Sequence, residues 1–152
     1  MAKKTIKLKL YQNIVNEYNA GGTITPGMLV KISNATTVVA HATAGGIGEK
    51  MFAIENELLG KTISDNYTSG NKVQTIICNA GDEVLGIIAD GQDVEAGELL
   101  VSNGDGKLKV MTPDASNVVI EQYPIAIALE DCDMSGSAGA DVPGGRCAVR
   151  IL

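Results

Sequence analysis

Short hydrophobic segments alternate with turn-forming residues along most of the chain. Each segment is rich in aliphatic or β-branched side chains, and glycine, asparagine or proline precedes most of them. The segments are residues 28–32, 36–41, 51–55, 73–78, 83–89, 98–101, 107–111, 118–120, 125–129 and 147–151. Short strands at a spacing of roughly ten residues are typical of sandwiches and barrels. The pattern therefore predicts an all-β fold.

Helical signals are weak by comparison. Residues 55–62 and 114–117 each favour one short turn, and the glycine- and serine-rich segment 133–145 is predicted to be an exposed loop. The predicted architecture is a compact β-barrel or β-tulip-like domain of about ten short strands with an extended N-terminal arm.

The second half of the chain repeats the pattern of the first. At an offset of 70, aliphatic residues and glycines coincide, and the match resumes at an offset of 75. The matching positions are Ile14, Val15, Gly21, Ile24, Gly27, Leu29 and Val30 with Val84, Leu85, Gly91, Val94, Gly97, Leu99 and Leu100, and Ala53, Ile54, Glu55, Gly70, Val73, Ile76 and Ile77 with Ala128, Leu129, Glu130, Gly145, Ala148, Ile151 and Leu152. Such a register indicates one supersecondary unit used twice, although similar patterns also recur in unrelated β-rich chains.

This repeat defines the expected domain organisation. Residues 1–20 form an N-terminal arm and lead-in, and residues 21–152 form a single β domain. Its pseudo-repeat halves span about 14–78 and 84–152, as the offsets indicate. No linker-like segment separates the halves, so they are expected to share one core.

The N-terminal arm has a period of two. Ile6, Leu8 and Leu10 point to one side, and Lys7 and Lys9 point to the other together with Tyr11. This alternation is typical of a strand with one apolar face. Such a strand pairs readily with another sheet, either in its own fold or in a neighbouring molecule.

Charge is distributed unevenly between the arm and the rest of the chain. Four of the 12 basic residues lie in the first ten positions, whereas all 18 acidic residues follow, and the net charge is −6. An acidic body argues against direct nucleic-acid binding. The basic arm is expected either to contact an acidic surface or to remain a solvated terminus.

Targeting and redox signals are few. No apolar run approaches the roughly 20 residues that span a bilayer, so no membrane partner is expected. The N-terminus lacks the features of a signal peptide, which favours cytoplasmic synthesis. Three cysteines without a CxxC pair favour free buried thiols, although one disulfide remains open.

Candidate catalytic residues are sparse. His41 is the only histidine, and a dyad with Cys78 has no supporting motif. Residues 45–50 contain Gly-Gly-Ile-Gly-Glu-Lys, but a strand follows them where a phosphate loop requires Ser or Thr and a helix. The sequence therefore predicts no enzyme, no cofactor and no metal site.

Acidic clusters and one lysine are further candidates for chemistry. Asp82 and Glu83, Glu95 and Glu98, and the cluster of Glu130, Asp131 and Asp133 are carboxylate groups in turns or at strand ends, where solvation is expected. The last cluster is the densest, and it could bind a cation weakly or meet the basic arm. Lys107 follows a hairpin turn but lacks the context of a biotinyl or lipoyl lysine.

Several motifs in a fixed order resemble those of one known family. They are Phe52–Asp65 with Tyr67, Gly70 and Val73, then Gly81–Val84, Ala89–Leu108, Pro124–Glu130 and Gly145–Ile151. Over most of residues 24–152 the chain resembles the head decoration, or capsid cement, proteins of tailed bacteriophages. The resemblance is weakest over the first 20 residues.

The resemblance implies a non-enzymatic virion protein that stabilises the outside of an expanded capsid. It implies a homotrimer at three-fold or quasi-three-fold positions, synthesised in the host cytoplasm, whose partner is the major capsid protein. The arm is the expected interface by analogy with such proteins. The interface residues are Lys3, Lys4, Thr5, Ile6, Lys7, Leu8, Lys9, Leu10 and Tyr11.

Other readings of the sequence remain open. The chain could be another virion β module from a tail or baseplate, or a host surface-adhesion domain. A hammerhead-type carrier or small-molecule-binding domain is a further alternative, in which Lys107 would carry the modification.

Overall fold

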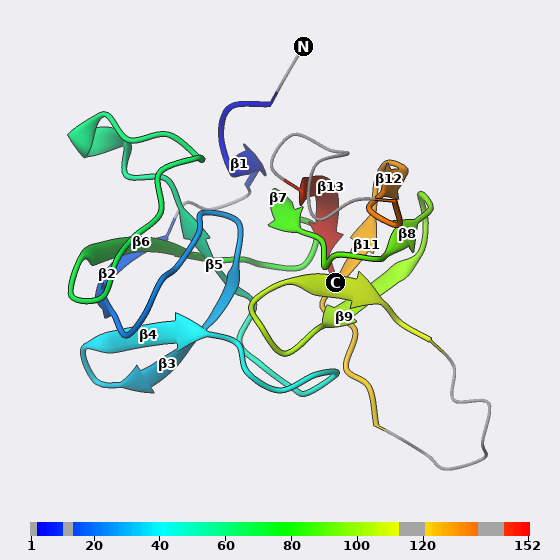
Figure 1. Ribbon diagram of the computed structural model, residues 1–152, viewed down its shortest axis with the longest axis horizontal. Coiled ribbons are helices and arrows are strands. Elements are labelled where there is room, and N and C mark those ends of the chain that lie inside the picture. Colours follow the sequence, from blue (N-terminus) through cyan, green and yellow to red (C-terminus); the bar gives the residue numbers. More distant parts are fainter. Residues whose placement is uncertain (1–2, 11–13, 113–120, 137–144) are drawn as a thin grey trace.

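The computed structural model is built from short β-strands in two adjoining units (Figure 1). It describes residues 3–10, 14–112, 121–136 and 145–152. Thirteen strands lie in these ranges, together with the short 3-10 helix η1 (Glu57–Leu59). The all-β class expected from the sequence is therefore confirmed, with more strands than expected. No helix in the described ranges is long and apolar enough to cross a membrane.

The first unit is a closed five-stranded barrel. Its strands are β2 (Val15–Ala20), β3 (Leu29–Asn34), β4 (Thr37–Ala40), β5 (Met51–Ile54) and β6 (Lys72–Ile77). Their order is β2-β4-β3-β5-β6, and β6 pairs with β2. The β2–β4 pair is parallel, and the other pairs are antiparallel. Closure leaves this unit without an unpaired sheet edge.

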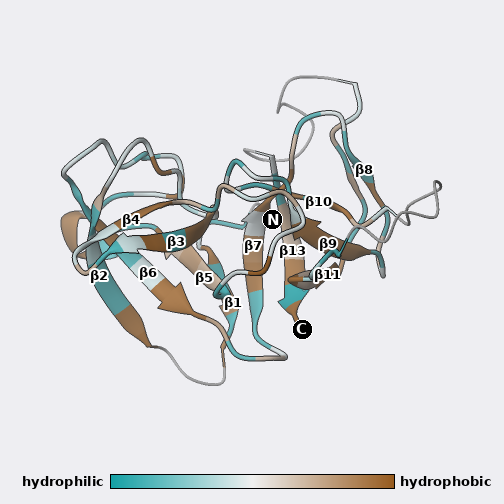
Figure 2. Ribbon diagram, turned by 90° about the horizontal axis from the view of Figure 1, so that it is seen from below, coloured by the Kyte–Doolittle hydropathy of each residue, from teal (hydrophilic) through white to brown (hydrophobic). Residues whose placement is uncertain are grey.

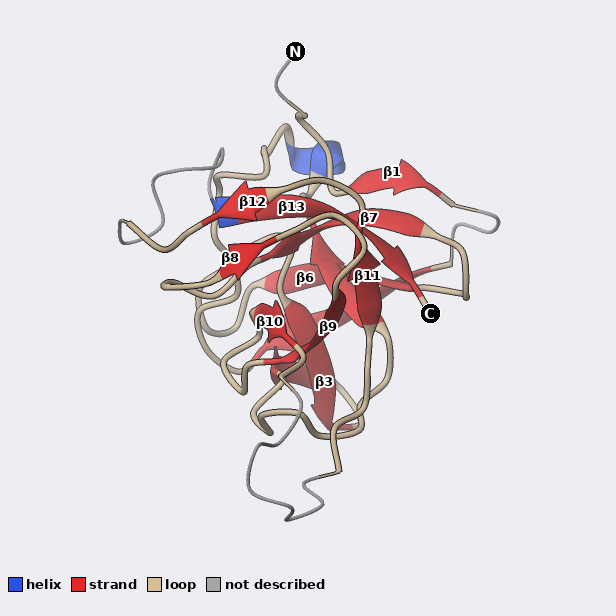
Figure 3. Cartoon of the chain, turned by 90° about the vertical axis from the view of Figure 1, so that its right-hand side faces the viewer, coloured by secondary structure: helices blue, strands red, loops and turns tan. Residues whose placement is uncertain are grey.

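The second unit is an open six-stranded sheet. It contains β1 (Lys7–Lys9), β7 (Glu83–Ile87), β9 (Leu99–Ser102), β10 (Leu108–Val110), β11 (Ala126–Ala128) and β13 (Arg146–Ile151). Their order is β1-β7-β13-β11-β9-β10. The two-residue strands β8 (Asp93–Val94) and β12 (Cys132–Asp133) form a separate ribbon. Figure 2 shows the barrel and the sheet beside each other, and Figure 3 shows β1 next to β7.

The two units have the same strand order when strands are matched by the sequence offsets of 70 and 75. The barrel order β2-β6-β5-β3-β4 then corresponds, strand by strand, to the sheet order β7-β13-β11-β9-β10. A parallel pairing joins β2 to β4, and a single parallel bridge between Ile88 and Leu108 links the equivalent region of the sheet. A unit used twice would produce this arrangement. The exact limits of the halves and the division from the arm stay predictions.

Local backbone geometry recurs in the same register. Gly27 and Gly97 both have positive φ, at 99° and 97°, a region that glycine adopts without strain. The Gly27 amide donates to Ala53 O at 2.8 Å, and the Gly97 amide donates to Ala128 O at 2.9 Å. These pairs are related by the same offsets of 70 and 75 as the sequence pattern, so the shared glycines have a shared turn geometry.

Buried apolar residues form two clusters. The smaller fills the barrel and consists of Ala20, Ile24, Val30, Val38, Met51, Ala53, Tyr67 and Val73. The larger lies mainly under the six-stranded sheet, but it includes Leu29, Phe52 and Ile76 from the barrel. There are thus two clusters, and the larger one contains residues from both units.

Arg146 adds a polar connection between the units. This β13 residue is 5% exposed, and its guanidinium donates to Pro26 O at 2.9 and 3.0 Å and to Ile63 O. Burial lowers the pKa of Arg146, and the nearby Glu55 carboxylate opposes that change. The side chain therefore links the second unit to two loops of the first.

Candidate functional site on the N-terminal arm

The N-terminal arm lies against the protein's own sheet. β1 pairs antiparallel with β7, with Lys7 opposite Val84 and Lys9 opposite Glu83, and the register shifts between the two pairs. The Leu85 amide donates to Ile6 O at 2.9 Å, which extends the pairing before β1 begins. The alternating pattern of the arm thus produces a strand, and that strand occupies the edge of the six-stranded sheet.

The apolar face of the arm is held in the larger cluster. Ile6 has no exposed surface, and Leu8 and Leu10 are half-buried against the same cluster. The Ile6 amide donates to Glu55 Oε2 at 3.1 Å, and Glu55 is itself only 3% exposed. The other carboxylate oxygen, Oε1, has no hydrogen-bond partner among the described residues. Ile6 therefore anchors the arm through both apolar burial and a buried hydrogen bond.

Three of the arm's lysines make ion pairs on the surface. Lys3 Nζ lies 2.6 Å from Glu130 Oε1, Lys7 lies 3.6 Å from Glu57, and Lys9 lies 3.4 Å from Glu83. The basic arm thus meets acidic groups of its own body, including the Glu130 cluster that the sequence had suggested as a partner.

Electrostatics favour the ionised form of two of these acids. Burial alone would raise the pKa of Glu130, but hydrogen bonds from Lys3 and the Ala148 amide outweigh it and lower the pKa. A hydrogen bond from Arg150 lowers the pKa of Glu83, and Lys9 contributes in the same direction. Both carboxylates therefore remain ionised and attractive to the arm at neutral pH.

The arm also presents groups to solvent. Lys4 is exposed, and it forms no ion pair within the described ranges; Thr5 is half-buried. β1 is the last strand of the sheet, so the side facing away from β7 is an open edge. A pocket of about 350 Å³ beside the arm is lined by Lys3, Lys4 and Lys61 together with Glu55 and Glu57. Tyr11 lies outside the described residues.

His41 and Cys78 are both buried, and their surroundings are those of structural residues. His41 is 2% exposed, with Nδ1 at 2.7 Å from Ser102 Oγ and Nε2 at 3.3 Å from Ile47 O. A carbonyl oxygen only accepts, so these contacts are satisfied by a proton on Nε2 and a hydroxyl proton donated to Nδ1. Burial raises the pKa of Cys78 to about 12, with Asp82 adding to the effect, which disfavours the reactive thiolate.

The remaining candidates from the sequence also have local partners. Lys107 lies 3.7 Å from Asp90 and is only partly exposed, which differs from a free lysine at a hairpin tip. Lys50, which directly precedes β5, donates to Leu152 O. Asp82 is completely buried and accepts from the Asn79 amide at 2.8 Å, whereas the sequence suggested a solvated acid. Most of these groups stabilise turns or strand ends.

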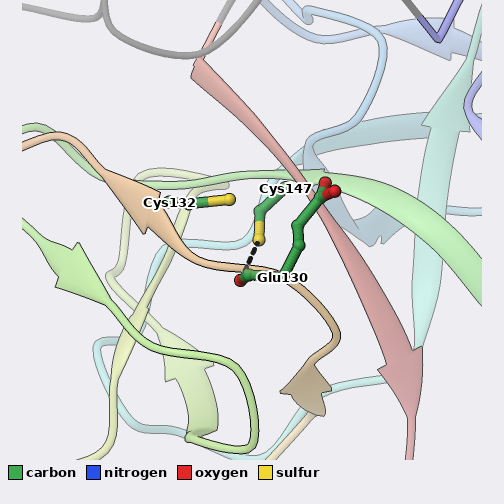
Figure 4. A group of neighbouring side chains, drawn as sticks. All are labelled: Glu130, Cys132 and Cys147. Atoms are coloured by element: carbon green, nitrogen blue, oxygen red, sulfur yellow. Dashed lines mark hydrogen bonds between the residues drawn. The ribbon is translucent and has the colours of Figure 1, made fainter. Parts of the chain in front are cut away.

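One cluster was missed by reasoning from the sequence. Glu130, Cys132 and Cys147 offer a carboxylate oxygen and two sulfur atoms that all lie within 4.8 Å of one another (Figure 4). Cys147 Sγ is 3.5 Å from the backbone oxygen of Glu130. Cys132 follows β11 by four residues and Cys147 lies on β13, so the antiparallel pairing of β11 with β13 helps to bring them together.

Comparison with known proteins gives one kind of match. No protein-family model and no curated protein matches the chain. Among solved structures, the N base of head fiber gp8.5 in bacteriophage phi29 is similar, with a TM-score of 0.57 and 14% sequence identity. The alignment covers 93% of this chain and 95% of that chain. The similarity therefore extends over nearly the whole of both chains and shows a common fold.

Proposed function

We propose that this chain is a non-enzymatic structural protein of a bacteriophage virion, which decorates and stabilises the outside of an expanded capsid. The observation that carries the proposal is the fold shared with the base of a phage head fiber along almost the full length of both chains. The ordered motifs that resemble capsid decoration proteins support it independently. The burial of His41 and Cys78 favours a structural role over catalysis.

The proposed assembly is a homotrimer at three-fold or quasi-three-fold positions of the capsid. Three identical subunits would each contact the shell, so the second and third contacts become intramolecular. Linked binding of this kind raises overall avidity by on the order of a hundredfold or more without any new type of contact. A weak contact by each subunit is therefore sufficient for stable decoration.

The contact with the major capsid protein is proposed to lie on the arm. The open edge of β1 has the main-chain groups needed for addition of a capsid strand. Exposed Lys4 and Lys9 would attract an acidic shell surface, while Ile6 stays in its own core. The arm would thus bind the capsid without leaving its own sheet.

Imaging of decorated particles tests the location. Purified protein is mixed with expanded, undecorated phage heads, and the particles are imaged by electron cryomicroscopy. Added density is expected at three-fold positions on the outer surface. Density only at positions away from the three-fold axes, or no binding to heads, would overturn the proposal.

Charge reversal on the arm tests the interface separately. Lys4→Glu is compared with Lys109→Glu on β10, the strand at the opposite edge of the same sheet. The first change is expected to weaken capsid binding on the order of tenfold and to reduce its salt dependence, because a rim charge steers association. The second should leave binding near the wild-type level. Equal effects would place the interface elsewhere.

The description of the phi29 protein as the base of a head fiber favours a second candidate. In this case the chain would anchor a longer appendage to the head. Images of complete virions separate the two candidates, because an anchor would lie at the foot of a protruding fibre and a decoration protein would not.

A further inference from the structure

Cys132 and Cys147 form a buried pair of thiols. Cys132 on β12 is 1% exposed, and Cys147 on β13 has no exposed surface. Their sulfur atoms lie within 4.8 Å of each other, and both are free in the structure. In Figure 4 the sulfur of Cys132 points toward Cys147. A disulfide requires the two sulfur atoms to approach to roughly 2 Å, and side-chain rotation is the movement that the proposal requires.

The third group of the cluster favours a disulfide over a bound metal. Both carboxylate oxygens of Glu130 lie 2.6 Å from Lys3 Nζ, and Oε1 also accepts from the Ala148 amide at 2.8 Å. A metal would have to compete with a cation for this carboxylate. The described residues also offer only three ligand groups here, whereas a structural zinc site uses four.

We propose that Cys132 and Cys147 are a redox site. A small-molecule disulfide such as oxidised glutathione would oxidise them, and they would form an intramolecular disulfide with each other. The bond would join β12 to β13 and enclose residues 133–146 in a covalent ring. This inference is independent of the proposed function, because it rests only on the position of the two thiols.

The chemistry balances as two successive thiol–disulfide exchanges. Cys132, as its thiolate, attacks one sulfur of oxidised glutathione and releases one glutathione, which takes up a proton. The Cys147 thiolate then attacks the Cys132 sulfur of the mixed disulfide and releases the second glutathione. The protein loses two electrons and two protons, and the oxidant is reduced to two thiols.

The order of attack follows from the unequal surroundings of the pair. A hydrogen bond from Cys147 lowers the pKa of Cys132, whereas the same contact and burial raise the pKa of Cys147. Cys132 also lies on a two-residue strand that, within the described part of the chain, pairs with β8 alone. Short strands with few hydrogen bonds open locally at low cost, which gives the oxidant access. Oxidation is therefore expected to begin at Cys132.

Peptide mapping of the whole folded chain tests the proposal. The protein is equilibrated in buffers of increasing ratio of oxidised to reduced glutathione, quenched, alkylated in denaturant and digested with trypsin. Cleavage after Arg146 separates the two cysteines into peptides 110–146 and 147–150, and Cys78 falls in peptide 73–107. We expect the titratable thiols to fall from three to one, with the first two peptides joined and Cys78 alkylated.

Variants and a thermal measurement sharpen the result. Cys78→Ser should leave the disulfide intact, whereas Cys132→Ser or Cys147→Ser should prevent it. The oxidised wild-type protein should unfold at a temperature roughly 5–10 °C higher than the reduced protein, because the cross-link constrains the unfolded chain. If a variant fails to fold, the peptide mapping of the wild-type protein still tests the proposal.

Three outcomes would overturn the proposal. In the first, all three thiols remain free when oxidised glutathione is in large excess. In the second, only links to Cys78 or between chains form. In the third, Zn²⁺ alone protects both thiols from alkylation at stoichiometric concentration, which would make the cluster a metal site.

Discussion

Ile6 is completely buried in the larger cluster, while Lys3 and Lys9 of the same arm make ion pairs at the protein surface. Full burial of an aliphatic side chain contributes about 1.5–3 kcal/mol, whereas a surface ion pair contributes about 0–1 kcal/mol. We therefore expect Ile6→Ala to lower the free energy of unfolding by about 2–4 kcal/mol, measured by urea denaturation. Lys4→Ala is the control and should change it by less than about 0.5 kcal/mol. Equal effects would mean that the arm is not anchored at Ile6.

Arg146 and Arg150 lie on the same strand but face different surroundings. Arg146 is buried and donates to the Pro26 and Ile63 carbonyls, whereas Arg150 is exposed and pairs with Glu83 at 3.0 Å. Arg146→Met would leave buried carbonyl groups without donors, so we expect a loss of about 2–4 kcal/mol in the free energy of unfolding.

Arg150→Met is the matched control for this change. Because it removes only a surface ion pair, the loss should be below about 1 kcal/mol, again measured by urea denaturation. A larger loss for Arg150→Met than for Arg146→Met would refute the bridging role of Arg146.

At the scale of the element, acidic pH should release the arm before the barrel unfolds. The pKa values of Glu130 and Glu83 are lowered in the folded protein. A lowered carboxyl pKa contributes stability that is present above the unfolded pKa of about 4.3 and is lost as pH falls through the folded pKa. We expect the hydrogen-exchange protection of the Leu85 amide, which donates to Ile6 O, to fall as pH decreases below about 4.

The barrel provides the internal control for this experiment. The Ala53 amide donates to Met28 O at 3.0 Å, and Ala53 belongs to the smaller cluster, which contains no described residue of the arm, so its protection should persist to lower pH. The double variant Glu83→Gln/Glu130→Gln should flatten the dependence at Leu85. A parallel loss at Leu85 and Ala53 would indicate global unfolding and contradict selective release.

The sequence predicted elements well where hydrophobic side chains were concentrated. The segment 51–55 corresponds to β5, which is buried at every position. It missed β2, whose residues Val-Asn-Glu-Tyr-Asn-Ala are mostly polar, because that strand is defined by its five-residue pairing with β6. The predicted strand 118–120 and the predicted turn 114–117 lie outside the described residues.

The site shows the same limit of sequence reasoning. Alternation in the arm predicted a strand with one apolar face, and this is the form that β1 takes. The choice between its own sheet and a neighbour depends on the free edge of β7, which no local pattern reveals. The proximity of Cys132 to Cys147 likewise depends on the register of β11 with β13, so spacing along the chain gave no signal.

At the scale of the whole molecule, the chain crosses between its two units at the arm. The barrel begins at Val15, yet β1 precedes it and completes the sheet of the second unit. The larger cluster also takes Leu29 and Phe52 from the barrel. Each half thus supplies part of the other's packing, and the two units are expected to unfold as one cooperative transition.

Cutting the chain between Asn79 and Ala80 tests this dependence. Both residues are exposed, and the cut lies in the turn in which the Asn79 amide donates to Asp82. Fragment 80–152 lacks β1 and the barrel residues of the larger cluster. Fragment 1–79 contains Ile6 but lacks β7, the strand with which β1 pairs. We expect neither fragment alone to give a dispersed NMR spectrum, and an equimolar mixture to recover that of the intact chain. If either fragment folded alone, its core would be self-sufficient, and the arm would be an accessory to the fold.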